Sequence, residues 1–324
     1  MKAVVQDRYG SPDVLEVRDV EQPVAGEGEV LVQVRAASVN AYDWHFMRGD
    51  PYLLARPAIG FRAPRAKIRG RDFAGVVETV GKGVTGLRPG DEVFGEVDGT
   101  FAEYVSVPES QIERKPASLT FEQAAAVPLA GNTALMGLRD KGRVQPGQRV
   151  VINGASGGVG SFAVQIAKAL GAEVTAVCSA RNAEFVRTLG ADHVVDYARE
   201  DFTRSGQRHD VVLDFVANRP LHDLRRALTP AGTLVLGGGG APGRLLGPAG
   251  LMLGAVALSP FVRQRLLPLI GPAPSKENLV ALRDLTESGK VSPVIERTYP
   301  LSEAPEAIRY LEGEHARSKI VITV

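Results

Sequence analysis

The 324-residue chain has one cysteine, few aromatic residues and no excess of charge of either sign. Its single cysteine, Cys178, excludes an internal disulfide framework and a zinc lobe held by four cysteines. Lys and Arg number 38 and Asp and Glu 37, so no basic field would attract nucleic acid or an anionic membrane. No apolar signal-peptide core follows Met1, and we expect a cytoplasmic protein with a small-molecule substrate and no membrane or nucleic-acid partner.

Two segments have no obvious role. The stretch from Leu245 to Leu258 is nearly all apolar, but its 14 residues are fewer than the about 20 that span a membrane. We expect a buried helix or a packed interface there, with a hydrophobic lid over the substrate as the alternative. The stretch from Gly60 to Lys67 is basic, and one interpretation is a mobile loop at the mouth of a cleft.

The character of the chain changes at Thr120, which indicates two domains. Before it, short β-branched runs alternate with turn residues, as in a small barrel or sandwich. Thr120 and Gln123 then match a capping box, and strand and helix patterns alternate. We expect a parallel-sheet domain at 120–273, inserted in a β-rich domain formed by 1–119 and 274–324. The expected strands are 2–5, 14–20, 29–37, 73–80, 92–94, 101–107, 149–153, 173–178, 194–196, 210–215, 232–236, 291–299 and 319–324. The expected helices are 158–170, 182–189, 221–228, one from 275, and 302–311.

A glycine cluster follows the strand pattern at 149–153 and leads directly into a helix. Ala155, Gly157 and Gly160 fall on the G-x-G-x-x-G spacing, with Ala in the first place. Such a turn brings the backbone N–H groups of a helix N-terminus close to a pyrophosphate. We expect this loop to bind a dinucleotide through Ala155, Ser156, Gly157, Gly158, Val159 and Gly160.

The end of the next expected strand indicates which dinucleotide. NAD-binding folds place an Asp or Glu there, which bonds the ribose 2′-hydroxyl. This chain has Ser179 and Arg181 instead, and a hydroxyl and a guanidinium suit a 2′-phosphate. We therefore expect NADPH, although Arg181 could also be a solvated surface charge. Cys178 is read as a small buried residue at the strand end.

Taken together, the motifs resemble those of the medium-chain dehydrogenase/reductase superfamily, in its zinc-independent quinone oxidoreductase-like branch. The resemblance covers essentially the whole chain. It rests on Val39-Asn40-Ala41-Tyr42-Asp43, Arg48-Gly49, Gly70-Arg71-Asp72-Phe73-Ala74-Gly75-Val76-Val77, Gly90-Asp91-Glu92-Val93, Ala130-Gly131-Asn132-Thr133-Ala134, Gly154 to Gly160, Leu189-Gly190-Ala191-Asp192 and Lys319-Ile320-Val321-Ile322. It implies an α/β fold in which a Rossmann-type doubly wound parallel sheet is inserted in a β-rich GroES-like domain, a partly open barrel. It also implies a homodimer.

The same resemblance argues against a catalytic zinc. Zinc alcohol dehydrogenases of the superfamily carry a Cys ligand near Asn40 and a Gly-His-Glu motif near Gly70. This chain has Asn40 and Gly70-Arg71-Asp72, and a catalytic zinc needs about three protein ligands. His45 has no partner at ligand spacing, and we expect it to form ordinary hydrogen bonds.

Without a Lewis acid, an acceptor that delocalises the incoming charge is the better substrate. We expect hydride transfer from NADPH to a quinone or another activated carbonyl, with an enone or enoyl reductase as the alternative. The resemblance places Asn40 and Thr133 beside the nicotinamide, and Tyr52 or Tyr42 near the substrate. Either tyrosine could instead be a core or rim aromatic.

Other cofactor contacts follow from the resemblance alone. They are Tyr197 near the adenine or 2′-phosphate, Asn218 in the loop after a strand, Gly237 and Gly238 at the nicotinamide half, and Lys319 near the cleft. Two further functions stay open. One is a protein that binds NADPH without catalysis. The other is a serine hydrolase, because Gly154-Ala155-Ser156-Gly157-Gly158 also fits G-x-S-x-G, with Asp214 and His222 following in order.

Overall fold

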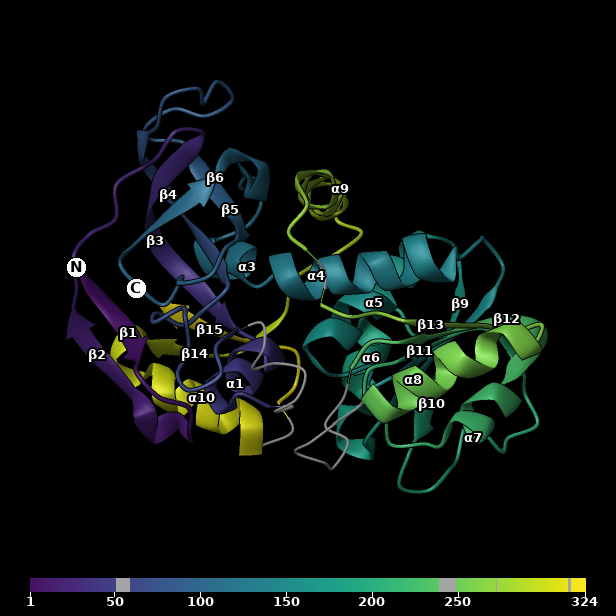
Figure 1. Ribbon diagram of the computed structural model, residues 1–324. Coiled ribbons are helices and arrows are strands. Elements are labelled where there is room, and N and C mark those ends of the chain that lie inside the picture. Colours follow the sequence, from purple (N-terminus) through teal and green to yellow (C-terminus); the bar gives the residue numbers. More distant parts are fainter. Residues whose placement is uncertain (51–58, 239–248, 272, 314–315) are drawn as a thin grey trace. The chain divides into compact units, whose positions relative to one another are not determined.

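A computed structural model describes residues 1–50, 59–238, 249–271, 273–313 and 316–324 (Figure 1). The described chain divides into two compact units. The first comprises Met1–Asn132, Ala273–Gly289 and Pro293–Val324, and the second comprises Thr133–Pro272 and Lys290–Ser292. The first unit therefore includes residues 120–132, which the sequence grouped with the dinucleotide domain. The domain limits at 120 and 273 stay a prediction.

The second unit is built on a six-stranded sheet in which every described pair of neighbours is parallel. Its order is β10-β9-β8-β11-β12-β13, which is the doubly wound order of a dinucleotide-binding fold. The chain reverses its direction of winding between β8 and β11, so ligands are expected at the carboxyl ends of these two strands. The strands are β8 (Arg149–Asn153), β9 (Glu173–Cys178), β10 (His193–Asp196), β11 (His209–Asp214), β12 (Leu228–Leu236) and β13 (Arg265–Pro268).

Helices cover the sheet on both faces, as the alternating sequence pattern predicts. Helix α5 packs over β8 and β9, whereas α7 and α8 pack against β12 and β13 (Figure 1). The Val, Ile and Leu side chains of β8, β11 and β12 are at most 1% exposed. The helices of this unit are α5 (Gly158–Ala169), α6 (Ala183–Thr188), α7 (Leu221–Arg226) and α8 (Ala249–Leu258), with a π-helical turn at Met136–Gly142.

The first unit is a mostly antiparallel sheet that does not close into a barrel. Its order is β14-β15-β3-β4-β5-β7, with β6 also paired to β3, and only β14 and β15 run parallel. A separate hairpin of β1 and β2 is joined to it by bridges from Ala3 and Val5. The strands are β1 (Lys2–Gln6), β2 (Leu15–Asp19), β3 (Glu29–Val39), β4 (Asp72–Val80), β5 (Glu92–Glu96), β6 (Tyr104–Pro108), β7 (Ile112–Arg114), β14 (Ile295–Pro300) and β15 (Lys319–Thr323).

Five helices complete the described part of this unit. The capping box at Thr120 is confirmed, because Gln123 N–H donates to Thr120 Oγ1 and Thr120 N–H donates to the Gln123 side chain. The helices are α1 (Ala41–Arg48), α3 (Phe121–Ala125), α4 (Pro128–Leu135), whose last residues belong to the second unit, α9 (Lys276–Glu287) and α10 (Ala304–Gly313).

The apolar segment from Leu245 to Leu258 was expected to be a buried helix or a packed interface, and its residues 245–248 lie outside the described residues. Its described part, α8, buries Ala249 and Ala255, but Leu253 is 62% exposed and Val256 is 52% exposed. The sequence could not separate these faces because the helix is apolar all round. None of the helices in the described part of the chain reaches the length and apolarity that a membrane span requires.

Candidate functional site

The glycine cluster forms a tight turn between β8 and the N-terminus of α5. The N–H groups of Gly154 and Ala155 both donate to the Val177 carbonyl, at 3.2 and 3.1 Å, so the turn is fixed to the neighbouring strand β9. Gly154 has φ +88°, and Gly157 is the residue that precedes the helix. The first N–H groups of a helix have no partner within it, and here they belong to Gly158, Val159 and Gly160. This is an anion-binding geometry.

The two glycines of the motif, Gly157 and Gly160, have different structural roles in this turn. A Cβ on Gly160 would lie 2.1 Å from the Gly154 carbonyl oxygen and 2.7 Å from Ala155 Cα, so only glycine fits there. A Cβ on Gly157 would meet only the Gly154 oxygen, at 3.5 Å. Gly160 thus lets the helix pack on the strand, and Gly157 keeps the space above the turn open.

The carboxyl ends of β8 and β11 are joined by a buried polar pair that the sequence did not single out. Asn153 Nδ2 donates to Asp214 Oδ1 at 2.9 Å, and the two residues are in register. The same oxygen accepts the N–H groups of Val216 and Ala217, and Ala217 is held at φ +56°. Asn153 also donates to Asn218 Oδ1 at 3.2 Å. Asp214 therefore positions the expected cofactor loop that contains Asn218.

The end of β9 approaches the glycine turn through a residue that the sequence did not predict. Asn182 is buried, and its Nδ2 donates to Ser156 Oγ at 3.0 Å. Because Ser156 accepts this bond, its own hydrogen can be donated to a ligand. Ser179 is half-buried, Arg181 is exposed, and Tyr197 is 46% exposed on the adjoining β10 turn, where its N–H donates to the Cys178 carbonyl at 3.2 Å. The buried position of Cys178 matches its interpretation as a packing residue.

In the first unit, Asn40 caps helix α1 and is held on several sides. Its N–H donates to Asp43 Oδ2 at 2.7 Å, which completes a capping box. Its Nδ2 donates to Asp72 Oδ2 at 2.9 Å, and its Oδ1 accepts from Lys319 Nζ. Burial raises the pKa of Asp43 to about 7, because the carboxylate loses its hydration. The Asn40 side chain is thus fixed in one orientation by charged partners.

Lys319 and Asp72 form the buried centre of this network. Both side chains are at most 2% exposed, and Nζ lies 3.6 Å from Asp72 Oδ2. Asp72 also accepts Ser38 Oγ–H at 2.8 Å and the Leu129 N–H at 3.0 Å. Burial lowers the pKa of Lys319, against the attraction of Asp72. Lys319 is therefore a buried residue, and its ammonium group donates a hydrogen bond to Asn40.

A further buried acid, Glu96, lies on β5 and was missed by the sequence analysis. Glu96 Oε1 accepts from Asn132 Nδ2 at 3.2 Å, and its Oε2 lies 3.6 Å from Arg71 Nε. Burial raises the pKa of Glu96 to about 7, and the nearby charge of Asp72 acts in the same direction. A glutamate at the end of a five-residue strand does not reveal from the sequence that its side chain is buried.

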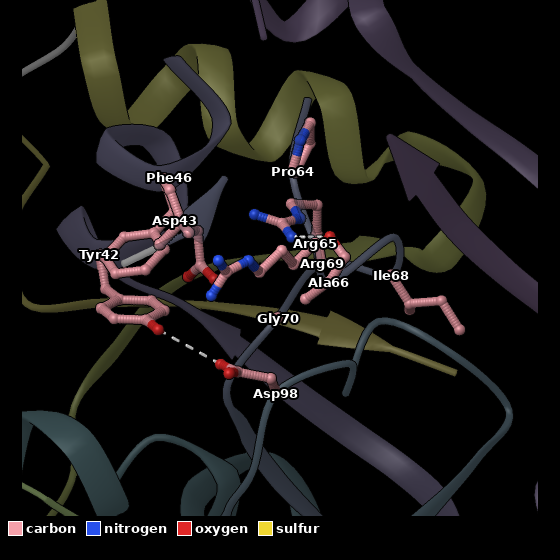
Figure 2. Close-up of a pocket in the computed structure, with 11 residues that line it drawn as sticks. Tyr42, Asp43, Phe46, Pro64, Arg65, Ala66, Ile68, Arg69, Gly70 and Asp98 are labelled. Atoms are coloured by element: carbon pink, nitrogen blue, oxygen red, sulfur yellow. Dashed lines mark hydrogen bonds between the residues drawn. The ribbon is translucent and has the colours of Figure 1, made fainter. Parts of the chain in front are cut away.

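Tyr42 lies between a cation and an acid at the edge of a cavity (Figure 2). Its hydroxyl is 3.3 Å from Asp98 Oδ1 and accepts from Arg71 Nη1 at 3.2 Å, while the guanidinium lies 4.8 Å above the ring. Burial and Asp98 raise the pKa of Tyr42 to about 12. The phenol therefore stays protonated at neutral pH and is suited to donating a hydrogen bond rather than to releasing a proton.

Of the remaining predicted site residues, the structure describes Thr133, Gly237 and Gly238 but not Tyr52. Tyr52 lies outside the described residues. Thr133 is buried on α4, next to Asn132, and Gly237 and Gly238 follow the last residue of β12. Apart from its chain neighbours, no described residue has an atom within 4 Å of the place that a Cβ on Gly238 would take.

The hydrolase alternative loses its support. Ser156 bonds to Asn182, and the exposed ring of His222 lies 3.5 Å from its neighbour Asp223, not beside Asp214. Among the residues that the structure describes, no group of three or more His, Cys, Asp or Glu side chains is arranged to hold a metal ion. His45, whose pKa is lowered by burial, stacks on Trp44 at 3.6 Å.

Known proteins resemble the chain over its whole length. The family described as "Alcohol dehydrogenase GroES-like domain" matches residues 26–117, and "Zinc-binding dehydrogenase" matches residues 189–322. The mitochondrial NAD(P)H oxidoreductase RTN4IP1 of Mus musculus is 36% identical, with 100% of this chain and 89% of that protein covered. The 2-methylene-furan-3-one reductase of Solanum lycopersicum is 33% identical, with 99% and 79% covered.

Solved structures agree in fold. The quinone oxidoreductase from Coxiella burnetii superposes with a TM-score of 0.86 at 31% identity, covering 100% of this chain and 99% of the other. Escherichia coli quinone oxidoreductase complexed with NADPH gives a TM-score of 0.85 at 25% identity, with both chains covered completely. The chain belongs to the medium-chain dehydrogenase/reductase superfamily, in its quinone oxidoreductase-like branch.

Proposed function

We propose that the protein transfers hydride from NADPH to a quinone or another activated carbonyl acceptor, without a zinc ion. The observation that carries the proposal is the end of β9, where Ser179 and Arg181 stand in place of a carboxylate and Asn182 holds Ser156 of the glycine turn. A carboxylate there would bond the 2′-hydroxyl of NAD and would repel a 2′-phosphate. The hydroxyl and guanidinium suit the phosphate instead.

An acid on the neighbouring strand does not oppose this assignment. Asp196 ends β10 and is in register with Cys178. Its Oδ1 accepts the Ala198 N–H at 3.1 Å, and its Oδ2 lies 3.6 Å from Arg199 Nε. The negative charge of Asp196 is therefore partly balanced within its own turn. The relative that was solved with NADPH adds support for the phosphorylated cofactor.

The residues of the second unit would bind and orient the cofactor. When bound, NADPH supplies the hydride. The N–H groups of Gly158, Val159 and Gly160 would hold the pyrophosphate, and the Ser156 hydroxyl would donate to it. Asp214 would keep the loop that contains Asn218 in place. Cofactor binding would then cost little conformational entropy in this loop.

Residues of the first unit would orient the acceptor. Asp72 and Lys319 hold the Asn40 side chain in place. Its amide stands where the zinc enzymes of the superfamily carry a cysteine ligand, and we therefore propose a reaction without zinc. A quinone or enone delocalises the charge that hydride transfer creates, so positioning and hydrogen bonds suffice. The Tyr42 hydroxyl donates its single hydrogen to Asp98 in this structure, so it would donate a hydrogen bond to the acceptor only by exchanging that partner. Tyr52 and Thr133 remain further candidates.

A second candidate function is reduction of the C=C bond of an enone. The tomato relative is named as a 2-methylene-furan-3-one reductase, which favours this reading. Product identification separates the two, because one reaction saturates a C=C bond and the other forms a quinol. A protein that binds NADPH without catalysis would consume no NADPH with any acceptor.

We also propose a homodimer formed through the edge of the second unit. β13 pairs with β12 alone among the described strands, and an unpaired strand edge invites a partner strand. Leu253, Val256, Phe261 and Ile270 are exposed apolar residues near this edge. Sedimentation equilibrium would test this, and a monomer at micromolar concentration would contradict it. The cytoplasmic location expected from the sequence stays a prediction, and the mouse relative is named as mitochondrial.

The experiment that tests the function is a panel of 1,4-benzoquinones and short enones, assayed with NADPH and with NADH. We expect turnover with NADPH on at least one class and a higher kcat/KM with NADPH than with NADH. Metal analysis of the purified protein should find no stoichiometric zinc. Equal use of both cofactors would contradict the NADPH assignment, and zinc-dependent alcohol oxidation would contradict the reaction.

A further inference from the structure

A cavity in the first unit lies beside helix α1 and under the basic segment that begins at Gly60 (Figure 2). Its volume is about 140 Å³. One part of its wall is apolar, and the other part is charged. The apolar part is formed by Phe46, Ile59, Pro64, Ala66 and Ile68, and the charged or polar part by Tyr42, Asp43, Arg65, Arg69 and Asp98.

The basic segment is held in place by hydrogen bonds to the rest of the unit. Tyr9 Oη donates to the Gly60 carbonyl at 2.7 Å, and the Arg65 N–H donates to the Ile59 carbonyl at 2.8 Å. The N–H of Gln6 in β1 donates to the Lys67 carbonyl at 2.7 Å, and the Arg69 N–H donates back to Val4 at 3.1 Å. These bonds make Arg69 a fixed part of the cavity wall.

Arg69 is the unusual group in this wall. The residue is only 7% exposed, and its Nε is buried without a hydrogen-bond partner. In the described part of the chain, its guanidinium makes one hydrogen bond, from Nη2 to the Ala66 carbonyl. A guanidinium has five N–H donors, and buried donors that stay unpaired are costly. A ligand in the cavity that offers acceptor oxygens would remove much of this cost.

The acids around the cavity already have partners, whereas Arg69 has few. The Arg71 guanidinium adjoins the cavity and lies 3.1 Å from Asp98 Oδ1, so that acid is already balanced. Asp43 is the other acid in the wall, and its Oδ2 already accepts the Asn40 N–H. Arg71 also lies 3.6 Å from Glu96, so Arg65, Arg69 and Arg71 face three acids and the formal charges balance. The unpaired Nε of Arg69 therefore carries the argument for an anion, because a carboxylate can accept two N–H bonds from one guanidinium.

We propose that this cavity is a subsite for an aromatic carboxylate, in which Arg69 binds the carboxylate and the apolar wall receives the ring. A cavity of about 150 Å³ is known to accept a benzene ring, so one six-membered ring fits the observed volume. If the protein is the proposed reductase, on which this part of the inference rests, the subsite selects acceptors that carry a carboxylate on their ring. Arg69 is then a specificity-determining residue, whereas Tyr42 and Asn40 serve the carbonyl.

Calorimetric titration of the full chain tests the subsite without any turnover. The probe is benzoate, and benzamide is the neutral probe of the same shape. We expect benzoate to bind at least 10-fold more tightly than benzamide. Arg69→Met should weaken benzoate at least 10-fold and leave benzamide unchanged, because it removes the charge and keeps a long side chain. Arg69→Lys should retain part of the preference. Arg62→Met is the matched control, because Arg62 is an exposed cation of the same segment that does not line the cavity.

Three results would overturn the subsite. They are equal binding of benzoate and benzamide by the unmodified protein, benzoate binding that Arg69→Met leaves unchanged, and an equal loss in Arg62→Met. If Arg69→Met fails to fold in a thermal scan, the two probes on the unmodified protein and on Arg69→Lys still decide. Turnover separates this proposal from the proposed function. An enone with a 4-carboxyphenyl group should have a higher kcat/KM than its methyl ester, and Arg69→Met should remove that difference. If none of the quinones and enones is reduced while benzoate binding still depends on Arg69, the reductase proposal fails and the carboxylate site stands.

Discussion

Alanine at Gly160 and at Gly157 should have different consequences, although both belong to one motif. A Cβ at Gly160 would lie 2.1 Å from the Gly154 carbonyl oxygen and 2.8 Å from the Ala155 carbonyl carbon. These are backbone atoms, so the turn itself has to move. Overpacking of this kind costs about 1–3 kcal/mol. For a domain of about 150–250 residues, that lowers Tm by roughly 2–12 °C. We also expect weaker NADPH binding, because the N–H groups that face the phosphate move.

The Gly157→Ala variant separates the fold from the site. Its Cβ would be 3.5 Å from the Gly154 oxygen, an ordinary contact, and φ is −79°. We expect a change in the free energy of unfolding within about 1 kcal/mol, but a clear loss of NADPH affinity, because the methyl group enters the space of the pyrophosphate. Gly250→Ala is the control, since among the described residues no atom outside its own helix backbone lies within 4 Å of its Cβ position. Differential scanning calorimetry measures Tm, and NADPH fluorescence titration measures the affinity for NADPH. An equal fall in Tm for both motif variants, or unchanged binding in both, would refute this reading of the turn.

Three further perturbations test the site. Arg181→Asp should weaken NADPH much more than NADH, because it places a negative charge where the 2′-phosphate is expected; an equal loss for both cofactors, measured by titration, would contradict the assignment. Asn182→Ala removes the 3.0 Å bond to Ser156 and should raise the Kd for NADPH about 3–10-fold, the effect of one net hydrogen bond of about 0.5–1.5 kcal/mol. The same substitution in a Ser156→Ala background should add little, and full additivity would show that Asn182 does not act through Ser156. Glu96→Gln tests the buried acid: burial raises the pKa of Glu96 from 4.5 to about 7, so the folded state holds a proton that the unfolded state loses. The stability of the unmodified protein should therefore fall relative to Glu96→Gln as pH rises from about 4.5 to about 7, and parallel urea-unfolding curves across that range would contradict it.

Much of the second unit could be predicted because its signals are local. β8 and β9 have the limits that the sequence predicts, since each is a short β-branched run that ends at a glycine turn or a cap. The helix expected at 158–170 is observed as α5, one residue shorter. The helices α1 and α4 were not predicted, because both are short and carry buried polar residues among apolar ones, such as Asp43 and Asn132. The capping box of α1, between Asn40 and Asp43, was a local signal that the sequence analysis missed.

In the candidate site too, the features formed by neighbouring residues could be predicted, and the contacts between distant residues could not. The glycine turn, and the lack of an acid after β9, were readable because consecutive residues form them. The contacts that orient Asn40 were not readable, because Asp72 follows it by 32 residues and Lys319 by 279. The roles of Glu96 and Arg69 were missed because a charged residue in a short segment reveals neither its burial nor its partners.

The sequence by itself determined the fold class, the position of the phosphate-binding turn and the absence of the side chains that would ligate zinc at the family's positions. These depend on residue identity and on spacing within a few turns of chain. The tertiary structure decided which polar groups are buried together: Lys319 with Asp72 and Asn40, Asp214 with Asn153, and Asn182 with Ser156. It alone revealed the nearly unpaired guanidinium of Arg69 in its cavity. The physical reason is that burial changes the cost of a charge, and burial is set by segments that lie far apart in the chain.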